Sequence, residues 1–260
     1  MLAATTPQIP HTIRKPYAVV SCHVEQPLED EVWRRFEALQ NRRPGGFEIA
    51  ALMRPPDRAS GESAGEALWL ERARAADARA PFGLHTHWTA PDHARPSGGL
   101  PADRVAEELA WLRERGLRPA LFCGGGWYSD AKVAGVLAET SVVDCTPTCF
   151  RPAYLPPDAP WLELAEPSLI VLPTGPELTA FPTTRSLGML ARALSRPRML
   201  SEPVVHAYFH DTDLLDSRRR RTLSLALALL ARRRAPLDHL TLINSLQPLP
   251  RIALEDCLRP

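Results

Sequence analysis

The stretch YAVVSCHV, from Tyr17 to Val24, has the β-branched and apolar residues of a buried strand. Glu25 follows it, and from Glu29 to Gln40 the apolar residues recur at helical spacing. A strand followed by a helix is the unit from which parallel sheets are built. Because this unit is repeated along the chain, we predict an α/β fold.

The later segments keep the same alternation. Strands are expected at residues 47–53, 81–87, 118–123, 141–145, 169–172 and 203–210, and helices at residues 65–79, 103–115, 130–139, 187–194 and 216–234. A terminal apolar piece lies near residues 240–246. Such alternation forms either a barrel or a doubly wound sheet. No internal repeat or long linker interrupts it, so we expect a single domain over residues 1–260 with its core at residues 17–246.

Composition excludes several classes of protein. Lys and Arg number 31 against 30 Asp and Glu, which leaves no net field to attract nucleic acid or an anionic membrane. The apolar run from Leu223 to Ala231 is far shorter than the ~20 residues that span a bilayer. We therefore expect neither a nucleic-acid partner nor membrane insertion. The composition leaves the oligomeric state open.

The cysteines and the N-terminus point to the cytoplasm. The five cysteines are odd in number and lack a paired CxxC spacing, so we expect reduced thiols rather than disulfides or a zinc ribbon. The segment up to Pro16 has no apolar run of signal-peptide length. A cytoplasmic location is the expectation that follows.

Polar residues gather where the predicted strands end. His23 and Glu25 lie at the end of the first strand, His85 and His87 at the end of the third, and His210 at the end of the strand at residues 203–210. In a (β/α) barrel the carboxyl ends of the strands form one rim, which carries the active site. We therefore expect these side chains to converge on one pocket.

The sequence His85-Thr86-His87 suggests a metal site. In an extended chain residues i and i+2 point to the same face, with Cα atoms about 6 to 7 Å apart. Glu25 would add a carboxylate, and two histidines with one carboxylate form a hydrolytic zinc site. We predict a divalent metal, foremost Zn²⁺, on Glu25, His85 and His87. The plainer alternative is that the two histidines merely end a strand.

His210 is predicted to act as a general acid. It stands at the transition from strand to loop, with acidic residues next to it. The plainer alternative is that His210 and Asp211 cap the following helix. His206 lies four residues earlier, about 13 Å along the strand, and is expected to be a hydrogen-bonded histidine inside the fold.

The glycine run at residues 124–126 indicates a close backbone approach, and its amides, with Gly125 at the centre, could hold a developing oxyanion. The aromatic residues Trp88, Trp127 and Tyr128 lie beside the same motifs and could stack on a sugar ring. As an alternative, each of the three belongs to the core. Cys123 is expected to be a buried thiol rather than a nucleophile.

These motifs occur in an order that resembles the polysaccharide deacetylase (NodB homology) family. The segments are SCHVE (21–25), FGLHTH (82–87), LFCGGGWY (121–128), HAYFHDTD (206–213) and LTL (240–242). The resemblance implies a distorted (β/α) barrel of about seven parallel strands and removal of acetyl groups from sugars with one divalent metal. The chain departs from the family pattern at His23, near the position of the acidic base, at Thr89, where a second histidine is expected, and at Cys123, in place of an arginine.

Two functions are weighed. The first is a metal-dependent hydrolase that removes an acyl group from an N-acetylated sugar or glycan precursor, with His23 as base and His210 as acid. The second is a catalytically silent barrel of the same kind that binds carbohydrate. In both, the expected partner is a small carbohydrate. A third possibility, an amidohydrolase-type barrel, would carry its HxH motif on the first strand, whereas here the motif is on the third.

Overall fold

The computed structural model describes residues 16–57, 61–88, 96, 99–146, 162–164, 169–172, 174–175, 177–179, 204–246 and 251–252. The helix expected at residues 187–194 lies outside the described residues, as do Thr89, His93, Cys149 and Cys257.

The described elements follow the predicted alternation. The strands are β1 (Tyr17–Val24), β2 (Ile49–Met53), β3 (Phe82–Thr86), β4 (Leu121–Gly124), β5 (Val143–Asp144), β6 (Leu162–Leu164), β7 (Leu169–Val171), β8 (Val204–His210), β9 (Ala235–Pro236) and β10 (Arg251–Ile252). The α-helices are α1 (Asp30–Arg42), α2 (Glu66–Asp77), α3 (Pro101–Glu114), α4 (Ala131–Thr140), α7 (Ser217–Arg233) and α8 (His239–Ser245). Short 3-10 helices are η1 (Pro44–Gly46), η2 (Glu62–Gly65), η3 (Gly125–Trp127) and η4 (Asp211–Leu215).

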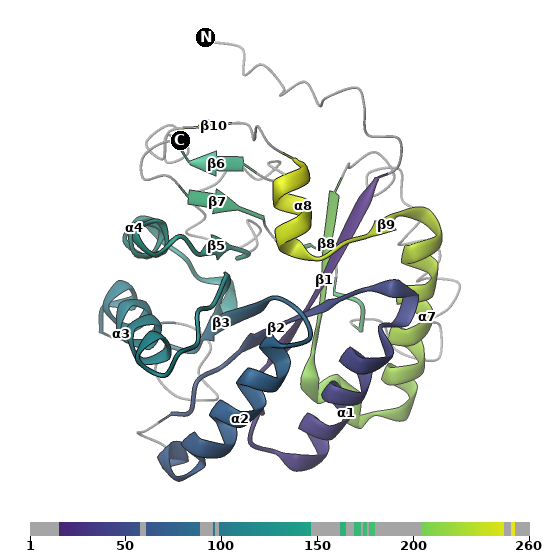
Figure 1. Ribbon diagram of the computed structural model, residues 1–260, viewed down its shortest axis with the longest axis horizontal. Coiled ribbons are helices and arrows are strands. Elements are labelled where there is room, and N and C mark those ends of the chain that lie inside the picture. The colour runs from purple at the N-terminus through teal and green to yellow at the C-terminus, as the bar shows by residue number, and fades with distance from the viewer. Residues whose placement is uncertain are drawn as a thin grey trace.

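The strands form one sheet in the order β10-β6-β7-β5-β4-β3-β2-β1-β8, with β9 beside β1. Within the described residues, the seven strands from β7 to β8 run parallel, and β6 is antiparallel to β7. The sheet is curled, and α1 to α4 and α7 lie around its outer side (Figure 1). The predicted distorted (β/α) barrel of about seven parallel strands is confirmed.

The chain after β7 connects the two sides of the curled sheet. The Gly175 N–H donates to the carbonyl of His206 at 2.7 Å, and the Leu178 N–H donates to that of Tyr208 at 2.8 Å. These bonds join β8 to the β7 side without a regular strand ladder. This irregular connection is what makes the barrel distorted.

The interior of the barrel is apolar at one end and polar at the other. Alternate residues of β1 point inward, and they run from Val19 through Ser21 to His23. At the apolar end Leu242 and Ile243 of α8 pack into the same cluster as Val19. The terminal apolar piece is therefore a helix that covers the N-terminal end of the barrel, and its first turn is capped by the Asp238 side chain.

The helix α7 buries one face only. Its buried residues recur at helical spacing, from Thr222 and Leu223 to Leu230, while the arginines at both ends are at least partly exposed. No helix among the described residues is both long and apolar enough to cross a membrane.

We expect Gly83→Ala to destabilise the protein by about 1 to 3 kcal/mol, because a Cβ at Gly83 would stand 2.3 Å from Leu52 Cδ2 and 2.8 Å from Leu121 Cβ. Urea unfolding measures this change. The matched control is Gly135→Ala in α4, where a Cβ meets nothing within 4 Å. That substitution should raise the free energy of unfolding by up to about 1 kcal/mol. Equal effects of the two substitutions would contradict the close packing at Gly83.

Candidate active site

The site lies at the rim where the parallel strands end. In the register of the sheet, His23 of β1 lies beside His210 of β8, and His85 of β3 lies beside Cys123 of β4. Glu25 follows β1 directly. The structure thus brings together residues from four separate strands, as the positions of the motifs predicted.

Two interactions fix the backbone around Glu25. The Asp211 carboxylate accepts a hydrogen bond from the N–H of Gln26 at 2.9 Å. From the opposite side, Arg54 Nε donates to the Glu25 carbonyl at 2.9 Å. The backbone that carries the Glu25 carboxylate is therefore held in place by the loops after β8 and β2.

The Glu25 carboxylate lies among three imidazoles. Its Oε1 is 3.5 Å from His85 Nε2, 3.6 Å from His87 Nε2 and 3.8 Å from His210 Nε2. Ligand atoms bound tetrahedrally to one zinc ion at ~2.1 Å are about 3.4 Å from one another. The Glu25, His85 and His87 ligand atoms all lie within 4.8 Å of one another. This donor set and spacing therefore fit a divalent cation such as Zn²⁺.

A hydrogen bond orients His85 for this role. His85 Nδ1 is 2.9 Å from the Cys123 carbonyl oxygen, which can only accept. The proton is therefore on Nδ1, and the lone pair of Nε2 faces Glu25. Metal-binding histidines commonly have such a partner on the other ring nitrogen.

The electrostatics keep Glu25 ionised. Burial raises the pKa of its carboxyl group, but the neighbouring imidazoles of His85 and His87 lower that pKa well below its usual range. For His85 burial lowers the pKa and Glu25 opposes this in part, so the net pKa is below the ordinary value. An anionic carboxylate beside a neutral imidazole is the state in which both bind a metal.

His23 lies deeper than the other rim histidines and is fully buried. Its ring stacks between His85, with centroids 4.6 Å apart, and Tyr208, at 5.0 Å. Within the described part of the chain, neither ring nitrogen of His23 has a hydrogen-bond partner. Burial lowers the pKa of His23 well below its ordinary value, and the neighbouring His85 and His210 add to this. His23 is therefore neutral near pH 7.

His210 has the opposite electrostatic environment. Burial lowers its pKa, but the Glu177 carboxylate, 3.5 Å from Nδ1, together with Glu25, raises the net pKa above the ordinary value. A cap is also present, but it pairs His210 with Asp213 and not with the expected Asp211: the His210 N–H donates to the Asp213 carboxylate at 3.2 Å. The side chain of His210 still faces Glu25 at the rim.

The glycine-rich turn makes the close backbone approach that was predicted. A Cβ at Gly124 would lie 1.8 Å from the Tyr128 carbonyl oxygen, so only glycine fits. Trp127 has a positive φ of 62°, a strained conformation for a tryptophan. Its ring lies 5.2 Å from that of His23 and 4.9 Å from that of Tyr208. This backbone conformation thus places the Trp127 ring beside the histidines.

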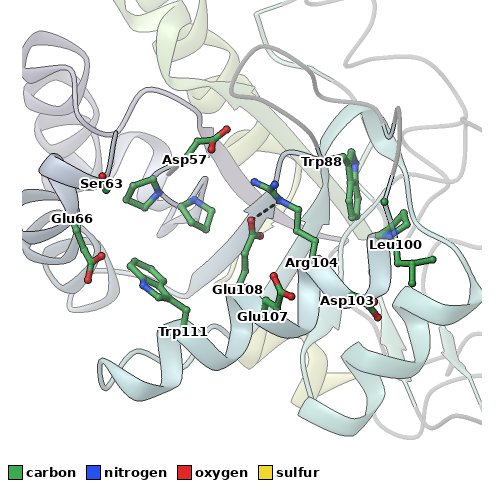
Figure 2. A pocket seen from close by; sticks show the side chains of 14 residues that line it. Asp57, Ser63, Glu66, Trp88, Leu100, Asp103, Arg104, Glu107, Glu108 and Trp111 are labelled. Carbon is green, nitrogen blue, oxygen red and sulfur yellow. Dashed lines mark hydrogen bonds and ion pairs between the residues drawn. The ribbon is translucent and has the colours of Figure 1, made fainter. Parts of the chain in front are cut away.

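Trp88 and Tyr128 are placed differently from Trp127. Their rings pack against each other with centroids 5.4 Å apart, and Trp88 Nε1 donates to the Gly125 carbonyl at 2.9 Å. Trp88 is almost fully buried, as the core alternative predicted, yet it also lines a cavity of about 530 Å³ (Figure 2). Arg104 and Glu108, which also line this cavity, form an ion pair.

Sequence reasoning missed two residues of the site, Tyr208 and Glu177. Tyr208 alternates with His206 and His210 along β8, so the same two-residue parity that singled out His85 and His87 would have found it. Glu177 belongs to the irregular connection after β7, and nothing in its local sequence marks it.

Comparison with solved structures identifies the fold. A proposed polysaccharide deacetylase from Mycobacterium smegmatis matches with a TM-score of 0.66 at 15% identity, over 98% of this chain and 99% of that chain. The chain has the polysaccharide deacetylase fold. A 4-alpha-glucanotransferase from Thermococcus litoralis matches this chain more weakly, with a TM-score of 0.53 at 12% identity, over 92% of this chain and 42% of that chain. No family model matches the chain, and no curated protein matches its sequence.

His206 is a buried, hydrogen-bonded histidine, as predicted. Its Nδ1 lies 3.1 Å from the Leu172 carbonyl, and its Nε2 lies 2.8 Å from Ser21 Oγ and 3.0 Å from His239 Nε2. Burial lowers the pKa of His206 to about 4. This group belongs to the barrel interior, below the rim.

The His206 pKa predicts an acid-sensitive fold. A histidine that is neutral when folded, with a pKa of about 4, and ordinary when unfolded contributes stability above pH 6.5 that is lost as the pH falls toward 4. The loss amounts to about 3 kcal/mol. Urea unfolding of the wild type at pH 7 and pH 4.5 should therefore show a steeper decline than for His206→Gln. Parallel declines would contradict a neutral buried His206.

Proposed function

We propose that the protein is a metal-dependent hydrolase that removes an acyl group, such as acetyl, from an amide nitrogen of a sugar or glycan precursor. The observation that carries this proposal is the Glu25 carboxylate, 3.5 to 3.8 Å from three imidazoles at the rim of the barrel. The polysaccharide deacetylase fold supports it, as for a divergent member of that family.

The site residues have two kinds of proposed role, metal binding and proton transfer. Glu25, His85 and His87 would hold the cation, for which Zn²⁺ suits the nitrogen and oxygen ligands. Such an ion supplies Lewis-acid chemistry, because it polarises a carbonyl oxygen and acidifies water. His23, neutral and without a hydrogen-bond partner in the described residues, accepts the proton of the attacking water. His210, whose pKa is raised, donates a proton to the departing amine.

The different environments of the two histidines support this division. A base and an acid of the same residue type need pKa values that are pushed apart. Burial lowers the pKa of His23, whereas Glu177 and Glu25 raise that of His210 against the effect of burial. The ring centroids lie 5.3 Å apart, so both can reach one small acyl group.

Aromatic side chains and the cavity favour a carbohydrate as substrate. The Trp127 ring lies beside His23. Trp88 lines a cavity together with Trp111 and several carboxylates, and the lining of this cavity includes neither Glu25 nor the rim histidines. Flat rings and hydrogen-bonding carboxylates suit the apolar faces and hydroxyl groups of sugars. We propose that Trp88, Trp127 and Tyr128, with the Gly125 backbone, contact this substrate.

Removing the carboxylate should weaken metal binding. Glu25→Gln keeps the shape of the side chain but not its charge, so we expect the affinity of the apoprotein for Zn²⁺ to fall at least about tenfold. Isothermal titration calorimetry measures this, and elemental analysis checks the purified protein. The matched control is Glu31→Gln in α1, an exposed carboxylate that pairs with Arg34 and Arg35. Equal zinc affinities in the two variants would contradict the proposed ligand set.

The acid role of His210 predicts a dependence on the leaving group. His210→Asn should lower kcat for an N-acetylated sugar by about 10²- to 10⁴-fold. An aryl acetate, whose leaving group needs no proton, should be affected far less. Equal losses on both substrates would count against proton donation by His210.

Glu177→Gln tests how His210 is tuned. Because Glu177 raises the pKa of His210, its removal should move the alkaline limb of the pH–kcat profile to lower pH. An unchanged alkaline limb would mean that Glu177 does not raise the pKa of His210.

The silent carbohydrate-binding barrel is the second candidate. The complete burial of His23 favours it, because a base with a strongly lowered pKa takes up a proton weakly. Bound zinc without release of acetate from a broad panel of N-acetylated sugars would support this candidate. Acetate release that is lost in Glu25→Gln would support the hydrolase.

A further inference from the structure

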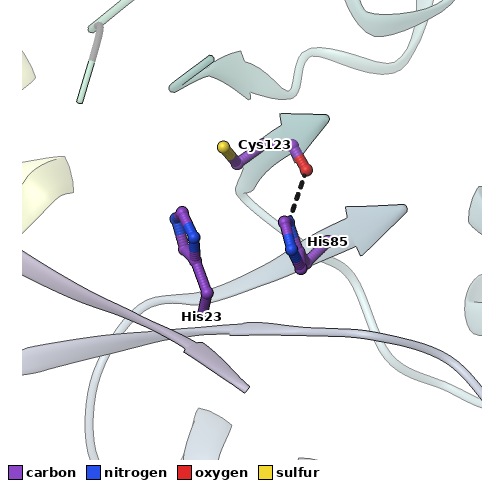
Figure 3. Close-up of side chains that lie close together, drawn as sticks. All are labelled: His23, His85 and Cys123. Carbon is purple, nitrogen blue, oxygen red and sulfur yellow. Dashed lines mark hydrogen bonds between the residues drawn. The ribbon is translucent and has the colours of Figure 1, made fainter. Parts of the chain in front are cut away.

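A second set of metal-ligand side chains lies beneath the rim. His23, His85 and Cys123 offer ligand atoms that are all within 4.8 Å of one another, and all three residues are buried (Figure 3). We refer to them as the inner set, and to Glu25, His85 and His87 as the outer set. The two sets share His85.

The inner set differs from the outer set in chemistry. It exchanges a carboxylate oxygen for a sulfur, and thiolate ligands select soft cations such as Cu⁺, Cd²⁺ and Zn²⁺. His23 supplies an independent sign of a missing ligand, because both its ring nitrogens are buried and lack a hydrogen-bond partner within the described residues. A buried imidazole in this state destabilises the fold, and a cation at the inner set would satisfy it.

We propose that His23, His85 and Cys123 bind one thiophilic cation, and that this binding inhibits the enzyme. On binding, the Cys123 thiol releases its proton to solvent and the sulfur forms a bond to the cation. Access is from the rim, past Glu25, whose side chain is 31% exposed. Inhibition follows because a His23 nitrogen bonded to a cation has no lone pair for a proton. This last step rests on the proposed function, whereas the binding itself does not.

Cadmium titration of the full-length apoprotein tests the binding. We expect one equivalent of Cd²⁺ to produce an ultraviolet thiolate-to-cadmium absorption band. The band should disappear in Cys123→Ser and persist in Cys145→Ser, a matched control because Cys145 is also a buried free thiol of the same core cluster. His23→Gln should weaken cadmium binding at least about tenfold. A band that survives in Cys123→Ser, or is absent from the wild type, overturns the proposal.

Two further arms keep the result interpretable. Cadmium NMR of the wild type reports a sulfur ligand without any substitution, so the test stands even where Cys123→Ser fails to fold. A spectrum with only nitrogen and oxygen ligands overturns the proposal. The band should also persist when Cys149 and Cys257 are both replaced by serine, and its loss there would assign the thiolate elsewhere and overturn it.

Glu25→Gln separates this inference from the proposed function. The substitution removes an outer ligand but leaves the inner set, so its cadmium band should remain while its zinc affinity at the outer set falls. Loss of the cadmium band in Glu25→Gln would overturn the proposal that the inner set binds a cation independently of the outer set. In an active wild type, Cd²⁺ should inhibit acetate release, and Cys123→Ser should relieve that inhibition at least about tenfold. Equal inhibition of both proteins overturns the inhibitory role alone.

Discussion

The in-register parallel pairing of β1 with β8 is the constraint on which the rim depends. It places His23 beside His210 and leaves Glu25 just beyond the end of β1. From there the Glu25 carboxylate reaches imidazoles of β8 and of the segment at the end of β3. A slip of one residue would turn these side chains to the other face of the sheet. The chemistry of the site is therefore fixed by backbone hydrogen bonds far more than by the side chains themselves.

The sequence predicted the rim because strand parity and parallel topology are local signals. HxH on an extended segment, and His23 with Glu25 two residues apart, needed only the two-residue period of a strand to be placed together. Glu177 could not be placed in this way, because it comes from a connection whose position depends on closure of the barrel. The sequence also predicted neither the helix α8 nor the antiparallel strand β6. Short apolar segments fit a helix and a strand equally well, and only their packing decides between them.

The opposite shifts of His23 and His210 show why the roles of the site residues needed coordinates. Both are histidines at strand ends, and the sequence distinguishes them only by the acidic residues next to His210. In the fold, His23 is enclosed by the rings of His85, Tyr208 and Trp127, whereas His210 faces the carboxylates of Glu177 and Glu25. Enclosure by rings favours a neutral imidazole, and nearby carboxylates favour a charged one. The surrounding groups, rather than the residue type, therefore decide which of the two histidines is protonated.

The interior of the barrel thus changes from a packed core to a reactive surface along one strand. Val19 packs in an apolar cluster, Ser21 is satisfied by His206, and His23 is buried without a hydrogen-bond partner in the described residues. The stability of the barrel comes from the lower layers, which can offset the cost of an unsatisfied polar group above them. Natural folds keep such a group where it serves a function. His23 lies between a carboxylate-containing ligand set and a thiol-containing one, so its ring nitrogen could serve either the proposed proton transfer or a cation, but not both at once.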